Sequence, residues 1–119
     1  MPDLGDPVSH LALREGVPVY DSEGKAFGVV EHVMTDEVTG IFEGLIIHTR
    51  PLPGRHLVAD PDQIADIRER GVVLAVGKDA LHDPDTEDRA GARDRHADEL
   101  ESRIEAMLRR AWDWLTARR

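Results

Sequence analysis

The segment from Val17 to Asp36, VPVYDSEGKAFGVVEHVMTD, constrains the fold more than any other part of the chain. It contains two apolar runs separated by Asp21-Ser22-Glu23-Gly24, a sequence typical of a tight turn. A second turn that ends in glycine follows at residues 37–40, and a third apolar run begins after it. Strands and turns at this spacing are typical of a small β-barrel or meander.

The apolar runs between residues 18 and 76 predict a set of short strands. Val30 and Val33 are an odd number of residues apart, so either both faces of their strand are partly buried or a bulge re-aims one side chain. The run 41–49 carries apolar groups on both faces, which predicts a central strand. Residues 61–70 fit one arm of a hairpin, with Ile64 opposite Val72 or Val73, or alternatively a helix. The expected strands are 18–20, 26–35, 41–49, 56–59, and a hairpin of 64–69 with 72–76.

Glycines and prolines separate these strands. Arg50-Pro51-Leu52-Pro53-Gly54-Arg55 predicts a loop, because its two prolines remove ladder donors. The glycines that we expect at structural turns are Gly24, Gly28, Gly40 and Gly71.

The composition limits the function classes. The chain has 119 residues and a formal net charge of −9, which argues against general nucleic-acid binding, since phosphate contact needs a basic surface. No cysteine is present, so disulfides and thiolate chemistry are excluded. The first ten residues do not resemble a signal peptide, and the longest apolar run is too short to span a bilayer. We therefore expect a cytoplasmic protein.

The sequence as a whole divides into four parts. Residues 1–12 predict a loose leader from which Leu11 and Leu13 could dock, and residues 13–81 form the barrel. Residues 82–96 carry no large apolar side chain, which predicts a flexible acidic linker. Residues 97–118 show helical periodicity, with an apolar stripe and flanking tryptophans that we take as the interaction surface: Leu100, Ile104, Met107, Leu108, Ala111, Trp112, Trp114 and Leu115.

An isolated helix of this length is marginal in water, so its apolar stripe needs a partner. The favoured partner is the barrel itself or a second copy of the helix, which would make a homodimer. A groove on another protein comes second. A membrane surface comes third, because Glu99, Glu101 and Glu105 in the first half of the helix would repel anionic lipid.

Residues 13–81 resemble the PRC-barrel family. The resemblance is carried by Gly16–Asp21, Gly24–Val30, Asp36–Gly40 and Leu45–Ile47, and then by Ile64, Ile67, Val72–Leu74 and Leu81. It implies a mainly β fold, a small closed six-stranded antiparallel barrel, here with an appended C-terminal amphipathic α-helix. It also implies a stand-alone module for assembly or protein–protein interaction, with no enzymatic activity. The family includes the cytoplasmic part of the reaction-centre H subunit and the C-terminal half of a ribosome maturation factor. The chain differs from both in its linker and helix.

Candidate chemistry is sparse. The histidines show no HxH, HxxxH or HExxH pattern. His32 and His48 could form a pair if their strands align on one face, and His56 could lie near them. Unliganded histidines are favoured, and we expect no metal, cofactor or catalytic residue. Carboxylates such as Asp36 and Asp60 suit turns and caps. An alternative function is RNA or ribosome-assembly binding by a basic rim at one end of the barrel, made of Arg50, Arg55, Arg68 and Arg70.

Overall fold

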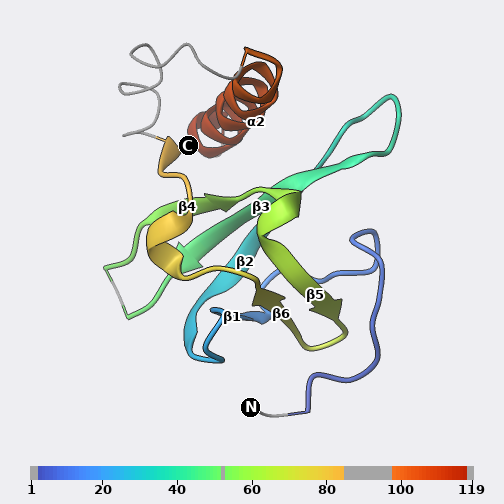
Figure 1. Ribbon diagram of the computed structural model, residues 1–119, viewed down its shortest axis with the longest axis vertical. Helices are drawn as coiled ribbons and strands as arrows, with labels where there is room; N and C mark the ends of the chain where they lie inside the picture. Colours follow the sequence, from blue (N-terminus) through green and yellow to red (C-terminus); the bar gives the residue numbers. More distant parts are fainter. Residues whose placement is uncertain (1–2, 52, 85–97, 118–119) are drawn as a thin grey trace.

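The computed structural model describes residues 3–51, 53–84 and 98–117, with side chains not described between 98 and 105. Six strands curl around one core, and a C-terminal helix lies across the outside of the sheet (Figure 1). The elements are β1 (Pro18–Tyr20), β2 (Ala26–Thr35), β3 (Phe42–Thr49), β4 (His56–Ala59), β5 (Ile64–Arg68), β6 (Gly71–Leu74) and α2 (Asp98–Ala117), with short 3-10 turns η1 (Pro61–Gln63) and η2 (Lys78–Ala80).

The strand limits agree closely with those predicted from the glycines and prolines that separate the apolar runs. β1, β2 and β4 have the predicted limits, and β3 begins one residue later than expected. The segment after Asp60 is a hairpin, because β5 pairs antiparallel with β6, and the alternative helix is confined to the single turn η1. Its register differs slightly from expectation: Ile64 lies opposite Leu74, and a bulge precedes Asp66.

The sheet is mixed and is not closed by hydrogen bonds, so the predicted closed antiparallel barrel is wrong in these two respects. The strand order is β4-β3-β2-β1-β6-β5, and β1 pairs with β6 in parallel through Val19 and Tyr20. Parallel pairing arises because β1 and β6 are joined by a long path through the other strands. β4 and β5 are the two edge strands and do not pair with each other, and the chain passes from one to the other through η1.

Segments outside the strands cover both edges of the sheet. On the outer edge of β4, the Val58 N–H donates to the His82 carbonyl at 2.7 Å, and the His82 N–H donates back at 3.0 Å. On the outer edge of β5, Pro7 forms a bridge with Arg68, and the Val8 N–H donates to the Ile67 carbonyl at 3.0 Å. Covered edges remove the templates on which strands of other molecules could pair.

The core lies inside the curled sheet, and its described members lie between residues 13 and 81. Its buried side chains are Leu13, Val19, Phe27, Val30, Leu45, Ile47, Leu57, Ala59, Val72, Leu74 and Leu81. β3 is central, as predicted: Leu45 and Ile47 point into this core, while Ile46 belongs to a second cluster on the outer face. Alternate residues of one strand thus serve two different cores.

A bulge in β2 resolves the odd spacing of its valines. Val30 lies opposite Ile47 and His32 lies opposite Ile46, so Glu31 is an extra residue on the β2 side. The inserted residue shifts the alternation, and both Val30 and Val33 pack against the inner core. The bulge alternative is therefore the correct one.

Three of the four expected turn glycines lie at turns. Gly24 and Gly40 have φ values of 83° and 75°, a conformation that other residues rarely adopt. Gly71 is the first residue of β6 and lies opposite Arg68, so it closes the β5–β6 turn as expected, whereas Gly28 lies within β2 and the expectation that it forms a turn is wrong. At Gly28 the reason is close approach, because a Cβ would lie 2.6 Å from the His48 carbonyl oxygen.

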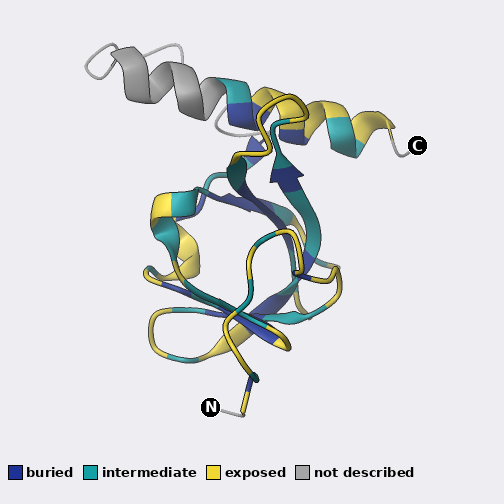
Figure 2. Ribbon diagram, turned by 90° about the vertical axis from the view of Figure 1, so that its right-hand side faces the viewer, coloured by how far each residue is buried: buried dark blue, intermediate teal, exposed yellow. Residues whose placement is uncertain are grey.

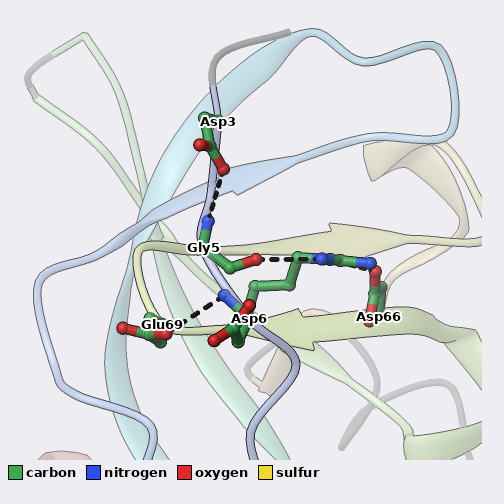
Figure 3. A network of polar contacts seen from close by, with 6 residues as sticks. Asp3, Gly5, Asp6, Asp66 and Glu69 are labelled. Carbon is green, nitrogen blue, oxygen red and sulfur yellow. Dashed lines mark hydrogen bonds and ion pairs between the residues drawn. The ribbon is translucent and has the colours of Figure 1, made fainter.

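The N-terminal segment is attached to β5, although its composition predicts a loose leader. The Arg70 N–H donates to the Leu4 carbonyl at 2.8 Å, and the Asp6 N–H donates to the Glu69 carboxylate at 3.1 Å. Arg68 donates to the Gly5 carbonyl at 2.9 Å while it also contacts Asp66 (Figure 3). The side chains that dock are Leu4 and Leu13, whereas Leu11 is exposed. The predicted linker from 85 onward lies outside the described residues.

Candidate functional site

The C-terminal helix packs on the outer face of the β2-β3-β4 sheet. Met107, Leu108 and Ala111 are buried there against three sheet residues, Met34, Ile46 and Val58. Figure 2 shows the buried side of α2 turned toward the strands and its exposed side turned away. These three residues of the stripe are therefore covered by the barrel of the same chain.

Gly44 allows this close packing. Its φ is 139°, and a Cβ at this position would lie 2.9 Å from the Met107 sulfur and 2.5 Å from the Ala59 carbonyl oxygen. Any side chain here would push the helix away from β3 or β4 away from its partner strand. The glycine thus sets how near α2 can lie to the sheet.

Polar contacts fix the helix on the sheet. Arg110 forms an ion pair with Glu43, whose side chain is largely buried. The Trp114 indole stacks on the His32 ring, with the ring centroids 4.4 Å apart and the planes 15° from parallel. The Glu15 carboxylate oxygen Oε2 lies 3.3 Å from Nδ1 of the same His32 ring. These directional contacts define the orientation of α2 better than apolar burial alone.

A small cavity lies where the helix meets the start of β4. Its volume is about 250 Å³, and its walls are Arg55, His56, Asp83, Pro84, Trp112 and Leu115. Arg55 and Asp83 face each other across it at 3.8 Å. Trp112 is 43% exposed, so an indole face is presented to solvent at the rim.

Beside this cavity, three strands bring metal-ligating side chains together. One ligand atom each from Glu31, His48 and His56 lies within 4.8 Å of the other two, and all three residues are half-buried. The two imidazoles stack with centroids 4.8 Å apart. The sequence indicated that His32 and His48 could pair with His56 nearby, but it gave no reason to include Glu31, because the position of the bulge cannot be read from residue spacing. His32 lies instead against Trp114.

The predicted interaction stripe is thus divided among different environments. Met107, Leu108 and Ala111 are buried, Trp114 and Leu115 are half-buried against the same cluster, and Trp112 is exposed. The side chains of Leu100 and Ile104 lie outside the described part of the chain.

The four arginines expected to form one basic rim lie in two separate places. Arg50 and Arg55 flank the β3–β4 loop, while Arg68 and Arg70 flank the β5–β6 turn, on the other side of the barrel in Figure 1. Three of them face carboxylates: Arg55 faces Asp83, Arg68 faces Asp66 at 2.6 Å, and Arg70 faces Asp3 at 3.7 Å. The structure does not gather them into a single cationic surface.

The β2–β3 turn displays apolar side chains on an ordered backbone. The Asp36 carboxylate accepts hydrogen bonds from the N–H groups of Thr39 at 2.9 Å and Val38 at 2.8 Å, and these bonds lower the pKa of that carboxyl. The Asp36 N–H also donates to the Ile41 carbonyl at 2.9 Å. Val38 is 94% exposed and Ile41 is 63% exposed, although both are large apolar residues.

Comparison with known proteins places the barrel in a family. No curated protein matches the chain. In the described residues, no helix is long and apolar enough to cross a membrane. The model of the PRC-barrel domain matches residues 14–81, which is more than half of the chain and corresponds to the inner core and its strands. The chain therefore belongs to the PRC-barrel family.

Proposed function

We propose that this chain is a non-enzymatic protein-binding module that acts in assembly, and that it associates with a second copy of itself. Membership of the PRC-barrel family supports an assembly or interaction role in general terms. The observation that carries the proposal is the β2–β3 turn, whose ordered backbone holds Val38 and Ile41 in solvent.

An ordered apolar turn is suited to binding. The chain gives up little conformational freedom on association, because Asp36 already fixes the turn backbone. Burial of two large apolar side chains contributes about 1.5–3 kcal/mol each. In an interface with two-fold symmetry the same patch meets its own copy, so each apolar residue is buried once on each of the two chains.

The contact surface differs from the one that the sequence indicates. Met107, Leu108 and Ala111 already pack on the barrel of their own chain, so a dimer built on them would require two chains to exchange helices. The β2–β3 turn requires no rearrangement. Trp112, which is exposed on α2, offers further apolar area at a second point on the surface.

The RNA-binding alternative has less support. The arginines are divided between two places, and Arg55, Arg68 and Arg70 face carboxylates. A net charge of −9 would also repel phosphate.

Light scattering coupled to size exclusion, carried out on the full chain over a range of concentrations, tests the proposal. We expect a mass of twice 13.3 kDa at high concentration. A Val38→Glu or Ile41→Glu change is expected to shift the protein to monomer. Ser22→Glu is the matched control, because it adds the same charge at an exposed residue of another hairpin turn.

A monomer at every concentration would refute self-association, and a dimer that survives both glutamate changes would refute the assigned surface. Salt-dependent retention of the wild-type chain on immobilised RNA would instead support the nucleic-acid alternative.

A further inference from the structure

The structure points to a zinc-binding site formed by Glu31, His48 and His56 on the outer face of the sheet. This inference goes beyond protein binding and does not depend on it. Two imidazoles and one carboxylate are a donor set that Zn²⁺ accepts, with nitrogen and oxygen at about 2.0–2.2 Å from the metal.

The strand register brings the two histidines together. His48 of β3 lies directly opposite His56 of β4 in the antiparallel ladder. Their neighbours Ile47 and Leu57 point into the inner core, so strand alternation places both imidazoles on the outer face. The ring centroids are 4.8 Å apart as a consequence of this pairing.

The bulge in β2 supplies the carboxylate. Val30 points into the core, and the following residue, Glu31, is the inserted one. Its carboxylate comes within 4.8 Å of the ligand atoms of both histidines, which are on the neighbouring strand and the next one. Bulges commonly re-aim a side chain at the edge of a functional site.

The ligand atoms lie near one another but farther apart than they would around a bound ion. Ligand atoms in a tetrahedral zinc site are about 3.3 Å apart, as metal–ligand distances of about 2.0 Å require. The observed separations are within 4.8 Å and the two imidazole planes are 15° from parallel, so the histidine side chains must rotate on binding for both rings to face one ion. All three residues are half-buried, which limits competing solvent and still leaves a path for the ion.

The surroundings leave room for a fourth ligand. His56 also lines the cavity of about 250 Å³ beneath Trp112 and Leu115, which is large enough for several water molecules. Three protein ligands with water in the fourth position are typical of zinc sites that stay open. Arg55 also lines this cavity, and the Asp83 carboxylate lies 3.8 Å from its guanidinium group.

The donor set also defines which ions are excluded. Mg²⁺ and Ca²⁺ prefer six or more oxygen ligands, whereas two imidazole nitrogens favour Zn²⁺ and its neighbours in the first transition row.

Isothermal titration of the tag-free full chain with zinc chloride tests the inference. We expect one Zn²⁺ per chain and no binding of Mg²⁺ or Ca²⁺. His48→Ala and His56→Ala should each weaken binding by at least about 100-fold, since even second-layer partners of a metal are worth about 10–100-fold. Glu31→Gln, which keeps the side-chain size, should weaken it by about tenfold or more. His10→Gln is the matched control, because His10 stacks on Phe42 at the opposite end of β3.

A second readout does not rely on affinity alone. Zinc at a free concentration of 100 times its Kd should raise the Tm of the wild-type chain by about 10 °C or more and leave that of the His48→Ala variant unchanged. Unfolding of the variants without metal shows whether each one folds. Zinc affinity that is equal in wild type and in the Glu31, His48 and His56 variants would overturn the site, as would no zinc binding by the wild type.

Discussion

Replacing Leu108 with glutamate should release α2 from the sheet while the barrel stays folded. Leu108 is 6% exposed and belongs to the outer cluster with Met34, Ile46 and Val58. Among the residues whose side chains are described, the buried members of the inner core all come from positions 13 to 81 and none from the helix. The two clusters should therefore respond separately.

The magnitude follows from the burial of one leucine. A buried leucine contributes about 2 kcal/mol, and a carboxylate in its place would cost several kcal/mol more if it stayed in contact with the sheet. The helix avoids that second cost by undocking, so the docking equilibrium shifts by at least about 2 kcal/mol, or about 30-fold. The adjacent Arg109→Glu change introduces the same residue on the exposed side of the helix and should leave docking intact.

The tryptophans provide the assay. The chain has two, and both lie on α2. In a Trp112→Phe background, Trp114 alone reports its stacking on His32. We expect a red-shifted, less structured emission from Trp114 in the Leu108→Glu variant, together with rapid proteolysis of the helix and an unchanged pattern of protected barrel amides.

Two results would refute this reasoning. Emission and protease resistance that match the wild type would show that Leu108 does not hold the helix. Loss of amide protection throughout β1 to β6 would show that the outer cluster is part of a single cooperative core.

Three further perturbations test other parts of the structure. Gly44→Ala should also weaken helix docking, because the new Cβ would meet the Met107 sulfur; unchanged Trp114 emission would contradict this close approach. The hydrogen bonds that lower the pKa of Asp36 stabilise the folded turn fully above the unfolded pKa, and this stabilisation is lost as pH falls from there through the lower folded pKa. Asp36→Asn should reduce that pH dependence of turn amide exchange while it keeps an acceptor; an identical pH profile would refute it. Arg68→Ala should destabilise the chain by about 1–3 kcal/mol in urea unfolding, because it leaves the Gly5 carbonyl without its donor, and Arg68→Lys should recover only part of this.

Much of the fold was predictable because the local signals agree with the tertiary structure. Glycine at positions 24 and 40 defined the two hairpins, and apolar groups on both faces of 41–49 indicated a strand covered on both sides. The helix was visible from its 3.6-residue period.

The remaining features depend on contacts between distant residues. The sequences of β1 and β6 do not indicate that the two strands pair in parallel, because their relative direction is set by the path of the chain between them. Leu4 is a single apolar residue among polar ones, so its docking on the β5–β6 turn could not be seen from composition. The three side chains of the proposed zinc site come from three strands, and the third one depends on a bulge whose position only the paired strand reveals.

The bridges at Pro7 and His82 have a practical consequence for anyone who expresses the barrel by itself. Both residues fall just outside positions 14–81, the stretch that matches the family. A fragment trimmed to those limits would carry two bare rows of main-chain donors and acceptors, on which strands from separate molecules can join. The stretch that matches the family is thus shorter than the stretch that covers both sheet edges, and a fragment should retain Leu4 at one end and His82 at the other.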